Sequence, residues 1–170
     1  MSGRVLVAGI GNIFLADDGF GCEVVRRLAG NDFPDEVEVV DFGIRGLDLA
    51  YALQDGYEAV IFVDALPRGE EPGTVYLIEP EIEEEGEVAL DTHGMDPVKV
   101  LRFARATGAE VPRTLVVGCE PKVVLSGEDY DDMMMELSGP VHAAVDEAVK
   151  LVGSLVDEIC GSRSGQGADD

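Results

Sequence analysis

The sequence predicts an α/β protein, a three-layer α/β/α sandwich built on a mostly parallel sheet. Two observations predict it: short, continuous, β-branched apolar runs alternate along the chain with segments whose apolar residues recur at helical spacing. Such alternation is typical of βαβ units, in which helices cover both faces of the sheet. With 170 residues, of which 46% are hydrophobic, the chain has the length of one domain and enough apolar residues for one core.

The apolar runs, taken in chain order, are the predicted strands. The fourth run follows a Pro-Gly pair whose glycine lies only nine positions beyond Asp64, which leaves too little chain for a helical crossover. We therefore expect this strand to be antiparallel or to lie at an edge of the sheet. The five predicted strands are Arg4–Ala8, Val37–Val40, Val60–Val63, Val75–Ile78 and Thr114–Gly118.

The predicted helices lie between and after these strands. Pro140 stands at the start of the last and longest one, where a missing N–H removes no hydrogen bond. Residues 161–170 have a disordered composition, so we expect a single domain over residues 1–160 followed by a disordered tail. The apolar stripes are Phe20, Val24, Val25 and Leu28; Leu47, Ala50 and Leu53; Val98, Leu101 and Ala104; and Val141, Ala144, Val145, Ala148, Val152, Leu155 and Ile159.

The charge balance excludes two classes of partner. The chain carries 12 basic and 35 acidic residues, so its net charge is −23, and a surface that negative repels nucleic acids and anionic membranes. Three widely spaced cysteines without a Cys-x-x-Cys pair argue against a disulfide framework and a structural zinc site. Apolar runs of the roughly 18 residues that a membrane helix needs are absent from the sequence. We therefore expect a cytoplasmic protein, and a monomer, since none of the predicted helices has a broad apolar face.

Acidic side chains follow the predicted parallel strands at the ends where ligands bind. Asp17 and Asp18 come after the first strand, Asp41 after the second and Asp64 after the third, and His93 precedes the third helix. Because the carboxyl ends of parallel strands meet at one edge of the sheet, we expect these residues to lie close together. Their spacing forms no motif, so this expectation depends on their shared position.

A dinucleotide site is one interpretation of the glycine loop, and the sequence argues against it. Gly9 and Gly11 match the first two glycines of the Gly-x-Gly-x-x-Gly fingerprint, but Phe14 occupies the third position. Asp17 and Asp18 would also stand where a helix N-terminus should receive a pyrophosphate. We therefore reject this interpretation.

A response-regulator receiver is a second interpretation. Such a domain has acids after its first strand, a phosphoacceptor aspartate after its third and a lysine after its fifth. Asp17-Asp18, Asp64 and Lys122 fit that plan, with magnesium as the implied ion. Against it, the acids lie well beyond the end of the first strand, and His93 has no role. This alternative would make the chain a magnesium-dependent signalling domain with Asp64 as the acceptor.

A metal-contacting set of Asp18, Asp64 and His93 is the third interpretation. Two carboxylates and an imidazole suit nickel, zinc or manganese, and three protein ligands leave coordination positions open for a substrate. The structural alternatives are that Asp17 or Asp18 caps a helix and that His93 is merely exposed. Asp64 is the hardest to explain structurally, because an acid that ends the buried run Val60–Val63 needs a partner.

Taken together, several short segments resemble the signature of the nickel–iron hydrogenase maturation endopeptidases. The segments appear in the family's order between residue 3 and about residue 121, and their combination is specific, whereas a single glycine loop or aspartate is not. They are Gly9-Ile10-Gly11-Asn12, Asp17-Asp18-Gly19-Phe20-Gly21, Asp41-Phe42-Gly43 with Gly46, Val63-Asp64-Ala65, Thr92-His93-Gly94-Met95, and Gly118 with Pro121.

The resemblance implies a single-domain α/β/α endopeptidase that removes a C-terminal extension from the precursor of a hydrogenase large subunit. It further implies that cleavage follows nickel insertion, and that nickel carried by the substrate, not held permanently by the enzyme, is the recognition element. The family's metal-contacting residues correspond here to Asp18, Asp64 and His93. The first-loop acid is often glutamate in the family, so Asp18 shortens the reach by one methylene. Cys119 stands where the family commonly has an aliphatic residue.

The resemblance also leads to a hypothesis for the reaction. Asp18, Asp64 and His93 would complete the coordination of nickel held by precursor cysteines, and polarisation of the peptide carbonyl or of a metal-bound water would promote hydrolysis. In the alternative, Asp18 or Asp17 acts as the general base for the attacking water. Glycine in the cleft lets a substrate backbone approach closely. The residues expected to contact the substrate are Asp17, Asp41, Gly43, Gly46 and Thr92.

Overall fold

A five-stranded sheet forms the centre of the computed structural model, which describes residues 3–80, 97–125 and 134–167. The strand order is β2-β1-β3-β5-β4, and every neighbouring pair is parallel except β5 with β4, which is antiparallel. The fourth strand is thus both antiparallel and at the edge, as the short connection after Asp64 predicts. The strands are β1 (Val5–Ile10), β2 (Val37–Gly43), β3 (Ala59–Ala65), β4 (Val75–Ile78) and β5 (Arg113–Cys119).

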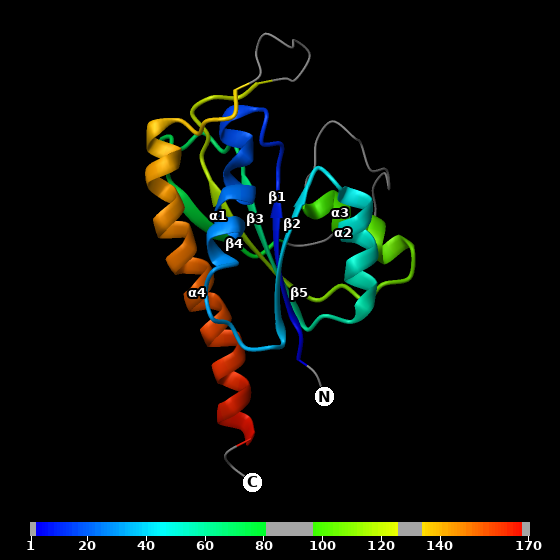
Figure 1. The fold of residues 1–170 in the computed structure, drawn as a ribbon. Helices are drawn as coiled ribbons and strands as arrows, with labels where there is room; N and C mark the ends of the chain where they lie inside the picture. Colours follow the sequence, from blue (N-terminus) through cyan, green and yellow to red (C-terminus); the bar gives the residue numbers. More distant parts are fainter. Residues whose placement is uncertain (1–2, 81–96, 126–133, 168–170) are drawn as a thin grey trace.

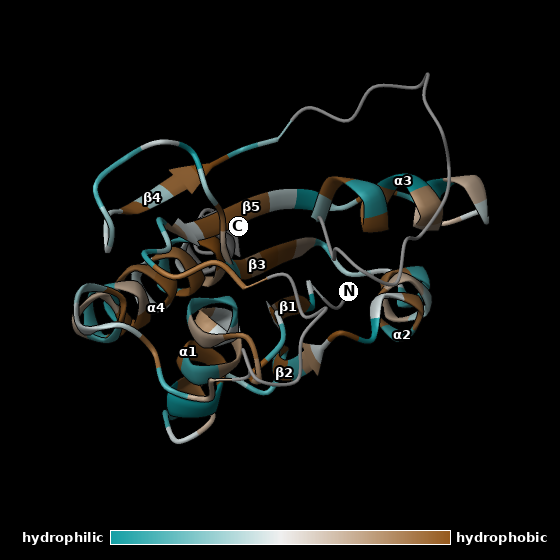
Figure 2. Cartoon of the chain, turned by 90° about the horizontal axis from the view of Figure 1, so that it is seen from above, coloured by the Kyte–Doolittle hydropathy of each residue, from teal (hydrophilic) through white to brown (hydrophobic). Residues whose placement is uncertain are grey.

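Helices cover both faces of this sheet, which confirms the predicted three-layer sandwich (Figure 1). Among the described residues, two α-helices lie on each face, and seen from above the sheet runs between the two pairs (Figure 2). The first face carries α1 (Phe20–Leu28) and α4 (Gly139–Gly167), and the second carries α2 (Gly46–Ala52) and α3 (Pro97–Ala106). The short 3-10 helices are η1 (Ala16–Gly19), before α1, and η2 (Leu53–Asp55), after α2.

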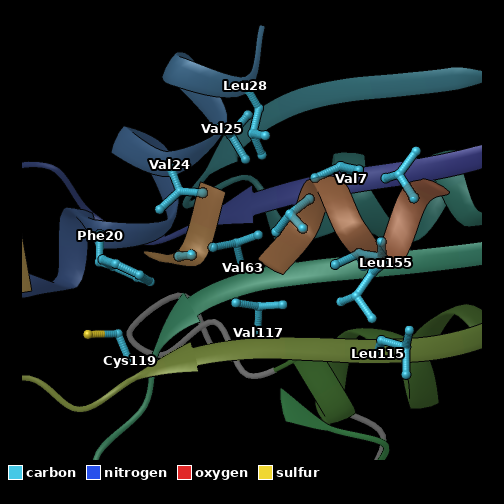
Figure 3. Close-up of a cluster of buried hydrophobic side chains, with 14 of the residues drawn as sticks. Val7, Phe20, Val24, Val25, Leu28, Val63, Leu115, Val117, Cys119 and Leu155 are labelled. Atoms are coloured by element: carbon cyan, nitrogen blue, oxygen red, sulfur yellow. The ribbon is translucent and has the colours of Figure 1, made fainter. Parts of the chain in front are cut away.

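Two apolar cores hold the three layers together. Figure 3 shows part of the first, in which Val7, Val63 and Val117 of the strands lie beside Val24 of α1 and Leu155 of α4. The second core lies between the opposite face of the sheet and helices α2 and α3. Each fully buried Val, Leu or Phe side chain contributes roughly 1.5–3 kcal/mol to folding. Because β1 and β3 are buried on both faces, they form a rigid base for the loops that follow them.

The register of the strands brings the predicted acids to one edge. Gly9 of β1 pairs with Asp41 of β2 and with Val63 of β3, and Asp64 pairs with Gly118 of β5. The segments that follow the four parallel strands therefore leave the sheet at the same edge, as the parallel topology predicts.

Helix α1 begins directly against the ends of β1 and β3, and this close packing requires glycine. A Cβ atom at Gly21 would lie 2.1 Å from the carbonyl oxygen of Val63 and 2.5 Å from that of Ile10. A Cβ atom at Gly9 would lie 2.6 Å from the carbonyl oxygen of Gly21. These glycines let the backbones touch, so that residues at the start of α1 lie beside the carboxyl ends of the strands.

Asp17 and Asp18 differ from one expectation of the sequence. They belong to η1, and α1 begins only at Phe20, with Gly19 in the cap position and no side-chain hydrogen bond to the helix end. The interpretation of either acid as the N-cap of α1 is therefore wrong, because both lie inside the 3-10 turn and Gly19 occupies the cap position.

The helices bear on two further predictions, the end of the domain and the absence of a membrane-spanning segment. The predicted boundary at residue 160 stays a prediction, and helix α4 is continuous across it as far as Gly167. In the part of the chain that the structure describes, none of the helices combines the length and the apolar character needed to cross a membrane.

Candidate active site

The loop after β1 holds Asp18 against its own backbone. The Asp18 carboxylate accepts a 2.7 Å hydrogen bond from the N–H of Asn12. Gly11 makes the turn possible, because its φ of +136° favours glycine and a Cβ atom there would lie 1.9 Å from the carbonyl oxygen of Asp18. Burial raises the pKa of the half-buried Asp18 carboxyl, and the Asn12 N–H acts in the opposite direction. A carboxyl with these properties is suited to contact a cation or to accept a proton.

Asp41 reaches the same edge from β2, and its side chain is exposed. Its carboxylate accepts a 2.9 Å hydrogen bond from the N–H of Gly43, which has a φ of +56°. The carbonyl oxygen of Gly43 accepts a 2.9 Å bond from the N–H of Gly11, which joins the loops after β1 and β2. The Arg45 guanidinium donates to the carbonyl oxygens of Asp41 (2.6 Å) and Phe42 (3.2 Å). The turn between β2 and α2 is thereby fixed with the Asp41 carboxylate accessible.

Asp64 lies at the same edge of the sheet as Asp41, since the strands that carry them flank β1, and Cys22 of α1 lies within range of their charges. Asp64 is the second-last residue of β3, a strand buried over its whole length, and is 3% exposed. Burial is the main cause that raises the pKa of the Cys22 thiol above its ordinary range, followed by the Asp41 carboxylate and then by the charges of Asp18 and Asp64. One sulfur atom is thus within electrostatic range of all three carboxylates. The thiol itself donates a 3.5 Å hydrogen bond to the carbonyl oxygen of Gly11. The structure thus places three of the predicted residues at one edge of the sheet, on three different strands and loops.

Asp17 has a structural environment that differs from that of its neighbour. It is completely buried, and its carboxylate accepts four hydrogen bonds of 2.7–2.8 Å. The donors are the N–H groups of Lys122 and Val123, after β5, and the N–H and hydroxyl groups of Ser138, just before α4. The sequence placed Asp17 among the substrate contacts and, alternatively, as a general base. In the structure its side chain has no exposed surface, and its oxygens are occupied by donors of the protein.

Glu120 is a site-edge residue that the sequence did not single out. It follows β5 directly and is 6% exposed, and its carboxylate accepts hydrogen bonds from the N–H groups of Arg68 (2.7 Å) and Gly69 (3.1 Å). Those two residues belong to the loop after β3, which Asp64 precedes. The signal in the sequence was an acid at the end of a continuous apolar run, the same signal that singled out Asp64.

Of the remaining predicted residues, the structure describes Gly46 but neither Thr92 nor His93. His93 and Thr92 lie outside the described residues, so the predicted metal contacts are placed for Asp18 and Asp64 alone. Within the described ranges, no three His, Cys, Asp or Glu side chains form a group that could hold a metal ion. Gly46 is the buried first residue of α2, behind the turn that carries Asp41.

Exposed apolar side chains lie on the loops that carry Asp18 and Asp41, on the first turn of α2 and on the segment before α4. Phe14 is 44% exposed, and main-chain hydrogen bonds join its loop to Met134: the Met134 N–H donates to the Phe14 carbonyl (2.9 Å), and the Ala16 N–H donates to the Met134 carbonyl (2.6 Å). We call the exposed side chains of these segments the apolar rim. It consists of Ile13, Phe14, Ile44, Leu47, Met134 and Met135.

Comparison with known proteins gives consistent matches over most of the chain. A family model described as hydrogenase maturation protease matches residues 22–155. A putative hydrogenase maturation protease from Methanocaldococcus jannaschii is 35% identical over 150 residues, which cover 87% of this chain and 93% of that protein. The hydrogenase expression/formation protein HoxM from Cupriavidus necator is 33% identical over 155 residues, covering 89% and 73% of the two chains.

Solved structures agree with these sequence matches. The hydrogenase maturating endopeptidase HybD from E. coli superposes with a TM-score of 0.73 at 27% identity and covers 91% of this chain and 93% of its own. The hydrogenase 2 maturation peptidase from a Thaumarchaeota archaeon gives a TM-score of 0.65 at 33% identity, with 90% and 97% covered. The receiver interpretation gains no support from these matches, and Asp17, one of the acids it needs for magnesium, is enclosed by hydrogen-bond donors.

Proposed function

The chain belongs to the hydrogenase maturation protease family and is a peptide hydrolase, and we propose that it removes the C-terminal extension from the nickel-loaded precursor of a nickel–iron hydrogenase large subunit. The observation that carries this proposal is the position of Asp18, Asp41 and Asp64 at the carboxyl ends of adjacent strands, where a backbone hydrogen bond joins the loops after β1 and β2. In an open α/β sheet this edge is where ligands bind.

Nickel enters the proposal as part of the substrate. Asp18 and Asp64 supply carboxylate oxygens, and His93 is proposed to supply an imidazole nitrogen, a mixed set that suits nickel. The ion arrives on the precursor's cysteines, and these three side chains complete its coordination. An enzyme that recognises its substrate through the ion acts on loaded precursors and spares empty ones.

The same residues are proposed to promote hydrolysis. Contact with Asp18 and Asp64 places the scissile peptide beside the ion, which polarises the carbonyl group or the attacking water. In the alternative, Asp18 accepts the proton of the attacking water, and the raised pKa of its carboxyl favours that role. Asp17 is left out of both routes, because its carboxylate is buried and already accepts four hydrogen bonds.

The apolar rim is proposed to contact the polypeptide around the cleavage site, together with Asp41, Gly43, Gly46 and Thr92. Rim residues such as Phe14 extend from the loops that carry the aspartates, so a peptide bond held at Asp18 brings its flanking residues onto them. A chain with a net charge of −23 repels other acidic proteins, and an uncharged surface next to the site lets a substrate approach closely. The cytoplasmic location and the monomeric state stay predictions.

Incubation of the purified chain with nickel-loaded and nickel-free precursor tests the proposal. We expect one discrete C-terminal peptide to be lost from the loaded form, seen as a fall in its mass, and the nickel-free form to stay intact. Asp64→Asn and His93→Ala should abolish the cleavage. Asp146→Asn is the matched control, because Asp146 is an exposed acid of α4 that pairs with Arg27 (2.7 Å).

Two outcomes would contradict the proposal at different points. Equal cleavage of both precursors would show that the enzyme does not recognise nickel, although it would remain a processing protease. Failure to cleave the loaded precursor, under conditions in which circular dichroism shows a folded enzyme, would exclude the proposed substrate.

A further inference from the structure

We infer that Asp17 and Glu120 are positioning residues, which fix the separation of Asp18 and Asp64 through the segment that follows β5. This inference rests on the proposed function, since it assumes that Asp18 and Asp64 act together on the substrate. It is carried by hydrogen bonds of two buried carboxylates, neither of which the proposed chemistry uses. We call residues 119–123 the bridge segment.

Asp17 fastens the loop of Asp18 to the bridge segment. Its fully buried carboxylate accepts hydrogen bonds from the N–H groups of Lys122 and Val123, both at 2.8 Å. It also accepts hydrogen bonds from the N–H (2.7 Å) and the hydroxyl (2.8 Å) of Ser138. Hydrogen bonds to an ionised acceptor are roughly twice as strong as neutral ones. Because Asp18 is the next residue in the same 3-10 turn, its position follows that of the bridge segment.

Glu120 fastens the opposite end of the bridge segment to the loop that follows Asp64. Its carboxylate accepts hydrogen bonds from the backbone N–H groups of Arg68 (2.7 Å) and Gly69 (3.1 Å). The backbone adds a further link, because the N–H of Leu66 donates to the carbonyl oxygen of Cys119 at 3.0 Å. The position of the chain just after Asp64 therefore also follows that of the bridge segment.

The connection before β4 holds the bridge segment from its other side, and Tyr76 of β4 holds the loop after β3. The Tyr76 hydroxyl donates to the carbonyl oxygen of Leu66, and burial raises the pKa of this hydroxyl to about 12, so it remains a donor. The N–H of Glu120 donates to the carbonyl of Thr74 (2.9 Å), and the N–H of Gly73 donates to the carbonyl of Glu120 (2.8 Å). The bridge segment is thus bonded on both sides, which makes it a rigid spacer between the two loops.

The functional consequence concerns the rate of the chemical step. Two groups that contact one substrate must keep their separation, and a misplacement of about 1 Å can cost on the order of 100-fold in rate. Loss of either carboxylate clamp should therefore lower kcat for the loaded precursor by about 10- to 100-fold. KM should change by less than about twofold, because the apolar rim that holds the polypeptide stays in place.

The test combines kinetics with amide hydrogen exchange of the substrate-free chain. In Asp17→Asn the amides of Lys122, Val123 and Ser138 should exchange faster, and so should those of Arg68 and Gly69, which Asp17 does not touch. In Glu120→Gln the amides of residues 68 and 69 should respond first and those of residues 122 and 123 to a lesser extent. This coupling across the bridge segment is independent of any activity.

A milder variant and a matched control complete the design. Ser138→Ala removes one donor to Asp17 and should lower kcat by about 2- to 5-fold, since most of the clamp remains. Glu38→Gln is the control, because it removes the charge of a hydrogen-bonded carboxylate outside both clamps. Glu38 lies in β2 and accepts hydrogen bonds from Arg4 and Tyr57, both at 2.5 Å. It should lower stability and change neither kcat nor exchange at the five clamped amides.

Three results decide the inference. If Asp17→Asn leaves exchange at Arg68 and Gly69 unchanged, the two clamps are independent and the inference is wrong. If Asp17→Asn lowers stability without lowering kcat, the clamp is merely structural and the inference is wrong. Ser138→Ala decides the same question if the Asp17→Asn variant does not fold. If the wild-type chain does not process the loaded precursor, the proposed function fails, and the exchange data alone confirm or exclude the coupling.

Discussion

Asp18 combines a proposed chemical role with an energetic cost. It is half-buried, and burial raises the pKa of its carboxyl, which means that the folded protein resists the ionisation that a metal contact or a general base needs. Charged groups held in this way are typical of functional sites. Its neighbour Asp17, in contrast, has every oxygen paired with donors of the protein.

Substitution of Asp18 by Asn should separate stability from activity. A raised pKa in the folded state means that the folded chain holds its proton more tightly, so the ionised Asp18 destabilises it as pH rises through that pKa. Asp18→Asn should therefore abolish processing and raise Tm at pH 7 by about 2–4 °C, the shift that ~1 kcal/mol gives a domain of this size. The gain in Tm should shrink as the pH is lowered toward the pKa of an ordinary aspartate, followed by calorimetry. A lower Tm at pH 7 would show that ionised Asp18 stabilises the fold.

At the scale of elements, the approach of α1 to the sheet determines whether a site can form. Gly9 and Gly21 let the helix start against the ends of β1 and β3, directly beside Val63, the residue before Asp64. The apolar rim also depends on the packing of separate elements. The β-bridge between Leu15 and Met134 joins the loop after β1 to the segment before α4, and both contribute rim residues.

Gly21→Ala should damage both the fold and the site. The added Cβ atom would lie 2.1 Å from the carbonyl oxygen of Val63, so α1 must move away from β3. We expect a loss of about 2–4 kcal/mol of folding free energy, which is typical of a severe clash in a core, and a loss of processing. Gly153→Ala in α4 is the control, because its Cβ atom would meet open space. It should stabilise by about 0.5–1 kcal/mol and leave processing unchanged. Equal effects of both substitutions on denaturant unfolding would contradict this explanation.

Phe14→Glu should weaken substrate binding without affecting the chemical step. Phe14 is 44% exposed, so the substitution removes apolar contact and adds a negative charge while its cost to folding stays within about 0.5 kcal/mol. We expect KM for the loaded precursor to rise by about tenfold or more, which corresponds to ~1.4 kcal/mol of binding, and kcat to change little. Leu77→Glu is the matched control, since Leu77 of β4 is also exposed, at 46%, and lies outside the rim. Similar effects of both variants would exclude a specific role of the rim.

The whole molecule is dominated by its net charge of −23. The described ion pairs are partly or fully exposed, as in Arg26–Glu23 and Arg27–Asp146, and 12 basic residues cannot compensate 35 acidic ones. Repulsion among the excess carboxylates therefore opposes the folded state at neutral pH and low salt.

Salt should consequently stabilise this protein. Raising ionic strength from about 0.1 M to about 1 M shortens the Debye length from about 10 Å to about 3 Å and screens the repulsion. We expect Tm at pH 7 to rise by several degrees over this range of sodium chloride, measured by circular dichroism. The increment should become small near pH 4.1, the isoelectric point, where the net charge approaches zero. A midpoint at pH 7 that does not rise with salt would show that repulsion contributes little to stability.

The sequence predicted the fold well because its signals are local. All five strands were identified from continuous apolar runs, although β1 and β2 extend further, to Ile10 and Gly43, because backbone pairing does not require an apolar side chain. The antiparallel edge strand followed from a short connection. The site was predicted in part: Asp18, Asp41 and Asp64 lie at the expected edge of the sheet, whereas their roles and the placement of His93 stay predictions.

The sequence by itself determined the fold class and the edge of the sheet at which the acids gather, since periodicity and the direction of parallel strands are properties of short segments. Only the tertiary structure decided which acids are accessible. Asp17 and Asp18 are adjacent residues of the same type, yet Asp17 is enclosed and Asp18 is half-buried. The physical reason is that the donors that enclose Asp17 come from residues 105, 106 and 121 positions away, and such partners are brought to it only when the sheet and α4 assemble.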